Sequence, residues 1–308
     1  MRKTILFIFY LLLIVFFVSC RTVPVTVPEN IETLPLEPGG LAYFLVDAAG
    51  ARPIFEPVYI PGLNPDHFKQ IIERTIYAAA AVFPQGNKMR FQLSARGRYP
   101  AARIRTALRF SRGWRRHRSP VSNEVFWHSA GTGISVAVDS RRILVAAAAD
   151  NTVVIDPYAA AGVAFPEGFG EFQRSSVISL WHENAGPMIN QQIRQMGVPI
   201  PIEVPVERFF ISLFPMPEQQ EAADAELLYQ AVLRLQAPDA SRAVMLMSVF
   251  VLARNFISPN VPAGAGGFAA IIPLLFANPP ERRGNNIDIT GTLSGEEISL
   301  LINAFLLD

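Results

Sequence analysis

Hydrophobic and polar positions follow two different periods along this chain. Short apolar runs, and runs in which every second residue is apolar, are typical of strands. Apolar residues spaced three and four apart are typical of amphipathic helices. The sequence therefore predicts strands over 41–46, 89–95, 124–129, 133–138, 142–148, 208–214 and 287–292. It predicts helices over 64–82, 99–114, 187–196, 218–235, 238–256 and 294–307.

These strands and helices follow one another without the strict alternation of a parallel α/β sheet, so the fold class they indicate is α+β. The last predicted helix has a capping box, because Ser294 is followed three residues later by Glu297. The helix over 238–256 has no charged residue from Ala243 to Ala253 and is bracketed by Arg242 and Arg254. A buried core helix and a membrane helix are both compatible with that pattern; its length favours the core.

One internal similarity suggests that the chain contains two related halves. The segment Leu93–Leu108 matches Ile287–Ile302: each has a strand, a glycine able to turn the backbone (Gly97 or Gly291) and a helix with the same inward spacing. The hypothesis is a first α+β half over 41–150, an irregular connection over 151–204 and a second α+β half over 205–308.

The first nineteen residues have the layout of an export signal. Arg2 and Lys3 are followed by an uncharged apolar run, Ile5–Val18, and then by Ser19 and Cys20. The run has about 14 residues, fewer than the roughly 20 that a membrane-spanning helix needs. A cleaved signal over 1–19 is the expectation, and an uncleaved signal-anchor is the alternative.

The sequence Phe17-Val18-Ser19-Cys20 resembles the lipobox of bacterial lipoproteins, particularly the looser form found in spirochaete lipoproteins, because Phe17 stands where Leu is usual. This resemblance covers only the first twenty residues. It implies a diacylglyceryl thioether on Cys20, cleavage before that residue and a further acyl chain, such as palmitate, on the new amine. Several acyl chains form a lasting membrane anchor, whereas one is reversible. The sequence does not decide between the inner and the outer membrane of the cell envelope.

The segment after the cysteine has the composition of a tether. Residues 21–40 contain four prolines and end in Gly39 and Gly40, and prolines at this density favour an extended chain. We therefore expect residues 20–40 to hold a folded domain away from the membrane surface.

Charge adds one local feature. The formal net charge of the whole chain is +1, which gives no general argument for nucleic-acid binding. Between Lys88 and Arg118, however, there are 11 basic residues and no Asp or Glu. If 99–114 is a helix, a single stripe along it contains Arg105, Arg109, Arg112 and Arg116. Guanidinium groups suit phosphate and carboxylate, so the partner could be an anionic lipid, glycan or protein. The alternative is that acids from other segments pair with the stripe.

Other chemistry has little support in the sequence. His67, His117, His128 and His182 show no metal-ligand spacing, so neither a metal nor another cofactor is expected. The glycines at 131–133 and 264–267 lack the Lys-Ser/Thr ending of a phosphate-binding loop, and no nucleophile motif is present. Trp114, Phe126 and Trp127 could stack on a ligand or belong to the core. Asp139, Asp156 and Glu183 could serve acid–base chemistry.

Together these patterns predict a lipid-anchored protein of the bacterial cell envelope with a non-enzymatic binding or assembly role. Its membrane contact is through the lipid on Cys20, and its second partner is anionic. The alternative is a cell-envelope hydrolase whose catalytic residues the sequence does not identify.

Overall fold

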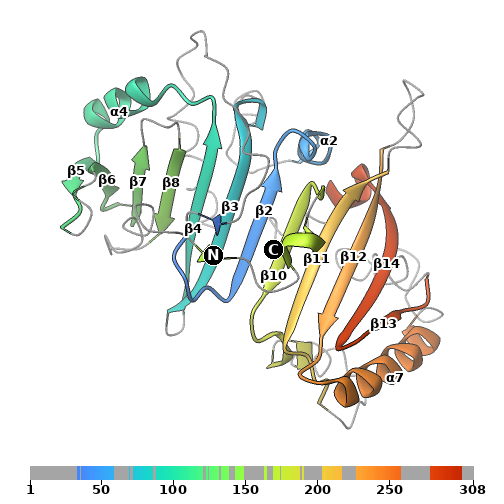
Figure 1. The fold of residues 1–308 in the computed structure, drawn as a ribbon. Coiled ribbons are helices and arrows are strands. Elements are labelled where there is room, and N and C mark those ends of the chain that lie inside the picture. Colours follow the sequence, from blue (N-terminus) through green and yellow to red (C-terminus); the bar gives the residue numbers. More distant parts are fainter. Residues whose placement is uncertain are drawn as a thin grey trace. The chain divides into compact units, whose positions relative to one another are not determined.

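A computed structural model describes sixteen stretches of the chain: residues 33–34, 36–58, 69, 72–85, 88–120, 123, 125–131, 133–138, 143–148, 163–164, 169–173, 175–187, 189–190, 203–216, 227–257 and 278–299. The fold separates into two compact units (Figure 1). Unit 1 comprises residues 1–171 with 306–308, and unit 2 comprises residues 172–305. Each contains both strands and helices, which confirms the α+β fold class.

Unit 1 is built on an antiparallel sheet. Its described strands pair in the order β2 (Ala42–Asp47), β3 (Thr75–Gln85), β4 (Lys88–Gly97), β8 (Ile143–Ala148), β7 (Ile134–Val138), β6 (Val125–Ser129) and β5 (Trp114–Arg118). Helix α4 (Ala101–Phe110) follows β4. Smaller elements are α2 (Arg52–Phe55), α5 (Phe169–Phe172) and the separate pair β1 (Thr33–Leu34) and β9 (Val163–Ala164).

One face of the unit 1 sheet forms a core with α4. Ile104 and Leu108 are four residues apart on the helix, and each is only 1% exposed. They belong to one apolar cluster with Trp127 of β6 and with Ile134 and Val136 of β7. Because burying an apolar side chain of this size contributes about 2 kcal/mol, this cluster fixes α4 against the sheet.

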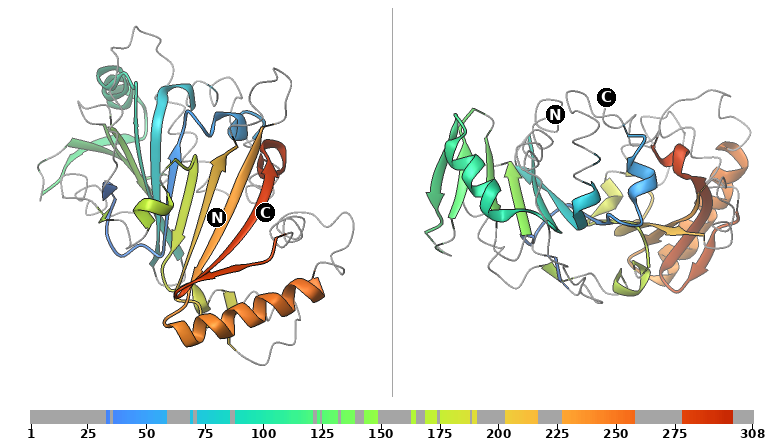
Figure 2. Two further views of the ribbon diagram at one scale, coloured as in Figure 1. Left: turned by 45° about the vertical axis from the view of Figure 1, so that its right-hand side comes forward. Right: turned by 90° about the horizontal axis from the view of Figure 1, so that it is seen from above.

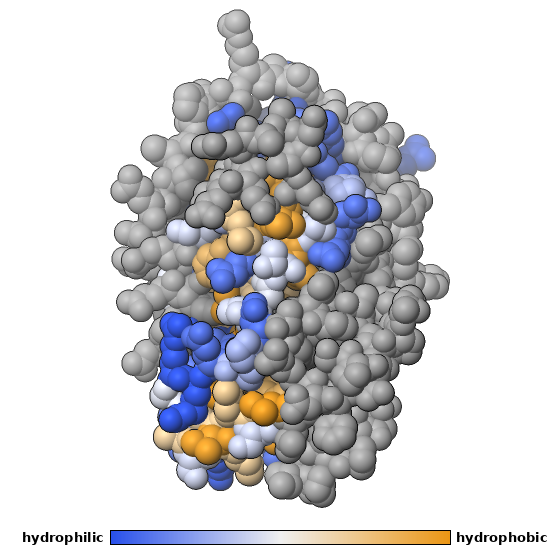
Figure 3. Space-filling model, turned by 90° about the vertical axis from the view of Figure 1, so that its right-hand side faces the viewer, coloured by the Kyte–Doolittle hydropathy of each residue, from blue (hydrophilic) through white to orange (hydrophobic). Residues whose placement is uncertain are grey.

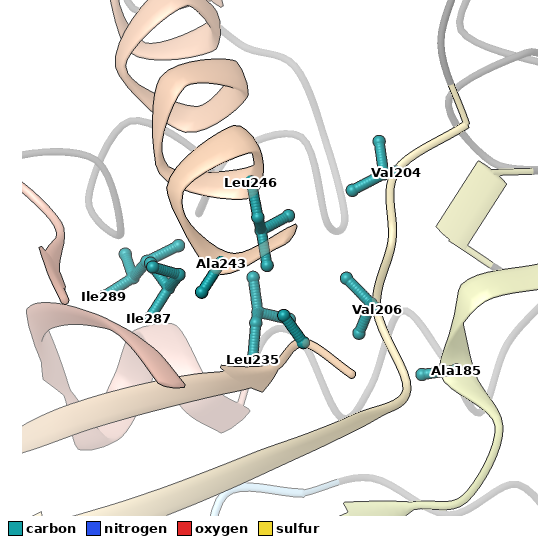
Figure 4. Packing of buried hydrophobic residues seen from close by; sticks show 9 residues of the cluster. Ala185, Val204, Val206, Leu235, Ala243, Leu246, Ile287 and Ile289 are labelled. Carbon is teal, nitrogen blue, oxygen red and sulfur yellow. The ribbon is translucent and has the colours of Figure 1, made fainter. Parts of the chain in front are cut away.

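The strands of unit 2 are also antiparallel and pair in the order β10 (Ile178–His182), β11 (Arg208–Pro215), β12 (Leu228–Gln236), β14 (Asn286–Ser294) and β13 (Glu281–Arg283). Helix α7 (Ala240–Ile257) lies across one end of these strands (Figure 2). Ala243 and Leu246 of α7 point toward Leu235 of β12 and toward Ile287 and Ile289 of β14 (Figure 4).

The outer side of α7 is partly apolar. Val244 is 52% exposed and Val251 is 42% exposed. Apolar and polar residues lie side by side on the face shown in Figure 3. Among the described residues, no helix has both the length and the continuous apolar character needed to cross a bilayer.

The two units share an order of elements that the sequence comparison did not identify. In unit 1, β2, β3 and β4 pair in chain order, α4 follows, and the hairpin β7–β8 returns to pair β8 with β4. In unit 2, β10, β11 and β12 pair in chain order, α7 follows, and the hairpin β13–β14 returns to pair β14 with β12. This order matches β4 with β12, whereas the sequence similarity had matched β4 with β14. The predicted connection over 151–204 contains β10, the first strand of the unit 2 sheet.

Two predicted helices are wrong in their second halves, although residues 69 and 72–74 of the first are helical. The second half of 64–82 is β3, and the second half of 218–235 is β12. Burial in β3 follows a period of two: Tyr77, Ala79, Ala81 and Phe83 are each at most 8% exposed. In β12, Ala231 and Leu235 are both buried. A separation of four residues fits one turn of a helix and also one face of a strand, so this spacing alone could not distinguish them.

The glycines of the internal similarity do not act as turns. Gly97 lies at the end of β4 and Gly291 lies within β14, opposite Ala231. Gly97 instead allows a close approach, because a Cβ atom there would stand 2.3 Å from the carbonyl oxygen of Arg74. Among the described glycines, those with positive φ are Gly39, Gly113, Gly133 and Gly284.

The predicted tether over 20–40 is also too long. Thr33–Leu34 pairs with β9, and Leu36 is fully buried. The Glu37 backbone N–H donates to Gln92 Oε1 (2.6 Å), and the Glu37 carboxylate forms an ion pair with Arg90 (3.0 Å). The described residues of 33–40 therefore belong to unit 1, because Leu36 is buried in it and the Glu37 carboxylate is paired with Arg90 of β4.

Other predictions are confirmed. Strands occur at all seven predicted positions, with no end shifted by more than two residues. Helix α7 matches 238–256. Residues 295–299 are helical, and the capping box is present: Glu297 N–H donates to Ser294 Oγ (3.1 Å) and Ser294 N–H donates to Glu297 Oε2 (2.8 Å). Residues 185–187 and 189–190 are helical at the start of the predicted 187–196 helix; residues 191–200 lie outside the described residues.

Candidate functional site: the arginine edge of unit 1

The basic segment does not form one helical stripe. Helix α4 ends at Phe110, the chain turns at Ser111–Gly113, and β5 begins at Trp114. Gly113 has a φ of 93°, a conformation that glycine adopts readily and that ends helices. Of the four residues of the predicted stripe, Arg105 and Arg109 are therefore on α4, Arg112 is in the turn and Arg116 is on β5. The helix predicted over 99–114 is present over Ala101–Phe110; its predicted end was wrong because it extended past this turn.

Arg105 has a structural contact. Its Nε and Nη2 atoms both donate to the backbone carbonyl oxygen of Val138, at 3.0 and 2.7 Å. Val138 is the last residue of β7, so the guanidinium group joins α4 to the end of that strand. Because two of its donors are already used by this carbonyl oxygen, Arg105 is less able to bind an anion than the neighbouring arginines are.

The other arginines of this region are exposed. Arg109, Arg112, Arg115, Arg116 and Arg118 all lie on the surface, and we call these five residues the arginine edge. Arg109 lies over the ring of Phe110, and Arg118 Nη1 donates to the backbone oxygen and Oδ1 of Asn123 at 3.1 and 3.2 Å. Within the described residues, Arg112, Arg115 and Arg116 have no acidic partner. The sequence analysis gave pairing with acids from other segments as the alternative. In the described part of the chain, Arg90 of the basic segment has such a partner, Glu37, whereas these three arginines do not.

Strand β5 forms an edge of the unit 1 sheet (Figures 1 and 2). Its one described neighbour is β6, with Arg115 opposite His128, Arg116 opposite Trp127 and His117 opposite Phe126. Side chains alternate between the two faces of a strand. Arg115 and His117 therefore share one face, and Arg116 and Arg118 share the other. The four residues from Arg115 to Arg118 are exposed, so both faces of this edge are open to solvent.

The aromatic residues near the arginine edge belong mainly to the core. Trp127 and Phe126 are at most 4% exposed, and Trp114 packs at the border of the α4 cluster. His117 stacks on Phe126 with ring centroids 5.3 Å apart, and its ring is 6.1 Å from that of His128. His128 Nδ1 is 3.0 Å from Ser135 Oγ. These contacts make β6 a firm support for β5.

The candidates for metal or acid–base chemistry do not come together in the described part of the chain. No group of three or more His, Cys, Asp or Glu residues lies close enough there to hold a metal ion. His182, in unit 2, stacks on Phe209 at 5.3 Å, and the Glu183 carboxylate accepts from Arg208 Nε at 2.7 Å. Cys20, His67, Asp139, Asp156 and the glycines at 264–267 lie outside the described residues.

The fold defined by these two units is an α+β fold found in solved structures. No protein-family model matches the chain, and no curated protein sequence matches it significantly. The fold is similar to that of TP0453 from Treponema pallidum, in three crystal forms. For form III the TM-score is 0.59 at 16% identity, covering 90% of this chain and 100% of TP0453. For form I the TM-score is 0.57 at 17% identity, and the match covers 90% of this chain and 99% of TP0453. For form IV the TM-score is 0.55 at 16% identity, and the match covers 89% of this chain and 97% of TP0453. At this identity the similarity concerns the fold alone.

Sequence reasoning located the basic segment but missed the feature that organises it, the edge strand β5. A signal for that strand was present. Gly113 separates the helical spacing of α4 from the five residues Trp114–Arg118, and a glycine just past a helix commonly marks its end.

Proposed function

We propose that this chain is a lipid-anchored protein of the bacterial cell envelope, attached through Cys20, in which the arginine edge of unit 1 binds an anionic partner. The role is one of binding or assembly. The observation that carries the proposal is the set Arg112, Arg115 and Arg116, which are exposed and have no acidic partner among the described residues.

Clustered cations without counter-charges repel one another, by a few tenths of a kcal/mol for each exposed pair. No Asp or Glu occurs between Glu73 and Glu124, so the local sequence offers nothing to reduce this repulsion. An anionic partner would reduce it. Guanidinium groups are suited to this role because each can donate two parallel hydrogen bonds to a carboxylate or phosphate.

The test compares two variants that remove the same charge. One replaces Arg112, Arg115 and Arg116 with Gln; its control replaces Arg242, Arg282 and Arg283, three exposed arginines of unit 2, with Gln. Two of the control residues have acidic partners, Arg242 with Asp239 and Arg283 with Glu281. Binding of the full chain is measured to dextran sulfate, to poly-glutamate and to vesicles with and without phosphatidylglycerol.

We expect the unit 1 variant to lose about tenfold in affinity for at least one anionic probe, since three surface ion pairs of about 0.5 kcal/mol each sum to that factor. The loss should shrink as salt is raised. The control variant should bind within about twofold of the wild type, because most of its arginines are already paired. Equal losses in the two variants would show that only net charge matters and would contradict the proposal.

The predicted alternative, a cell-envelope hydrolase, has no assembled catalytic group within the described residues to support it. The acids that sequence analysis selected for it are either outside those residues or, in the case of Glu183, paired with an arginine.

A further inference from the structure

The open edge of β5 adds a geometric constraint to the charge of this region. A strand at the edge of a sheet has backbone N–H and C=O groups pointing away from its single neighbour, and they can pair with another extended chain. Among the described residues β5 pairs with β6 alone, in an unbroken register from Trp114↔Ser129 to Arg118↔Val125. Among the described residues, no strand pairs with the side of β5 that faces away from β6, and this is the side that strand addition would use.

From this we infer that β5 is a strand-addition site, and that its ligand is an extended acidic segment of another protein. The inference rests on the proposed function and names the class of partner. The added segment would continue the unit 1 sheet by hydrogen bonding to the free side of β5. Its acidic side chains would meet Arg115 on one face and Arg116 and Arg118 on the other.

The distribution of arginines over two faces favours a peptide rather than a membrane. A lipid surface is flat on the scale of five residues, so it could meet the arginines of one face and would leave those of the other in water. An added strand has side chains on both faces, about 5 Å from those of its neighbour. Arg115 and Arg116 can then each reach a carboxylate on the same segment.

Charge also decides which extended chains are accepted. A second copy of this chain, pairing through its own β5, would place arginine beside arginine, which is unfavourable directly across a sheet. Charged residues, especially basic ones, are a common way to keep sheet edges from aggregating. Here the four residues Arg115–Arg118 contribute three arginines, and Arg109 and Arg112 precede them. This is more positive charge than protection of a sheet edge requires, and an acidic ligand could bind to the additional arginines.

The experiment uses two octapeptides of equal length and charge. The first, Thr-Glu-Glu-Val-Thr-Glu-Glu-Thr, can form a strand with glutamates on both faces. In the second, Pro-Pro replaces the central Val-Thr, which removes two backbone donors and blocks strand pairing. Affinity is measured for the full-length wild type and for the two triple variants described above. Hydrogen exchange of residues 114–118 is followed with each peptide.

We expect the first peptide to bind the wild type about tenfold more tightly than the proline peptide, because loss of one or two backbone hydrogen bonds corresponds to that factor. It should slow exchange in residues 114–118 and leave residues 281–294 unchanged. The variant lacking Arg112, Arg115 and Arg116 should bind it about tenfold less tightly than wild type.

Three other outcomes would overturn the inference. Equal arginine-dependent binding of the two peptides, without slowed exchange in β5, would show an electrostatic site without strand addition, and the proposed function would stand. Arginine-dependent binding to phosphatidylglycerol vesicles alone, with neither peptide bound, would identify a membrane surface as the partner. Failure of the arginine variant to change binding to any anionic probe would contradict both the inference and the proposed function.

Discussion

Individual arginines in this chain have different roles that depend on what each guanidinium group contacts. Arg105 donates twice to a backbone carbonyl and belongs to the packing of unit 1. Arg90 pairs with Glu37, and Arg208 pairs with Glu183. In the described part of the chain, Arg112, Arg115 and Arg116 have none of these contacts, and they form the centre of the arginine edge. Sequence spacing treats these residues alike, because it contains no information about the carbonyl or carboxylate that folding brings near.

A titratable residue in unit 2 gives a prediction about pH. His182 is 7% exposed and stacks on Phe209. Burial lowers the pKa of His182 below its usual 6.5, an effect that Glu183 partly offsets. The unfolded chain therefore binds a proton on this residue more readily than the folded chain does. Its contribution to stability is complete above about pH 6.5 and is lost as the pH falls below that value.

We expect the free energy of unfolding to fall more between pH 7.5 and pH 5.0 in the wild type than in a His182→Gln variant. This difference is measured by urea unfolding at both pH values, with hydrogen exchange in β10 and β11 as the probe of unit 2. His117→Gln is the control, since His117 is an exposed histidine of unit 1. An identical pH dependence in the wild type and the His182 variant would show that His182 remains as easily protonated in the folded chain.

At the scale of elements, the sequence predicted strands better than helices. Strands with a clear alternation or a short apolar run, such as β4 and β11, were predicted within a few residues. The errors arose where two periods coincide, as in β12, and where alanine, a good helix former, fills a strand, as in β3. Pairing with neighbouring strands decides such cases, and that information lies far away in the sequence. For the same reason the basic segment could be predicted, but its position at a sheet edge could not.

The pairing of β12 with β14 contains an ion pair that supports a second prediction. Arg234 and Asp288 are directly opposite each other, and Arg234 Nε and Nη2 donate to the two oxygens of Asp288 at 2.7 and 2.8 Å. Asp288 is 6% exposed. Asp288→Asn should lower the free energy of unfolding of unit 2 by about 3 kcal/mol, because it leaves a partly buried guanidinium without its counter-charge.

A double variant, Arg234→Met with Asp288→Leu, should recover at least about half of that loss, since replacing both partners with apolar groups avoids the unpaired charge. Urea unfolding at pH 7.5 tests both variants. A double variant that is less stable than Asp288→Asn would indicate that the two residues stabilise the sheet independently of each other.

At the scale of the whole molecule, the two units share an order of elements. This order changes which segments the duplication hypothesis treats as equivalent. The matching elements are β2–β3–β4–α4 with β10–β11–β12–α7, and the hairpin β7–β8 with β13–β14. Between its helix and its hairpin, unit 1 has the strands β5 and β6. In unit 2 the described residues resume only at residue 278, directly before β13. Three residues of the arginine edge, Arg115, Arg116 and Arg118, are on β5. If the units are related by duplication, most of the proposed binding site lies on a strand with no counterpart among the described residues of unit 2.

The proposed anchor is tested on the mature protein taken from its native membrane. We expect an intact mass equal to residues 20–308 plus acyl chains, with a cleaved signal over 1–19, and a Cys20→Ala variant that lacks the acyl mass. An unprocessed chain, or a processed one without acyl groups, would contradict the lipoprotein assignment. Binding of the anionic probes by the Cys20→Ala variant would then be judged separately, because the arginine edge does not depend on the anchor.

The pairing of Thr33–Leu34 with β9 and the burial of Leu36 have a further consequence: they limit the length of the proposed tether between Cys20 and unit 1. With residues from Thr33 onward joined to unit 1, twelve residues remain between Cys20 and the folded domain. Twelve residues span at most about 40 Å when fully extended. The field of a charged bilayer decays over about 8 Å at physiological ionic strength. If Cys20 is lipidated as proposed, a segment of this length is long enough to hold the arginine edge beyond the field of the lipid head groups, where a protein partner has access to it.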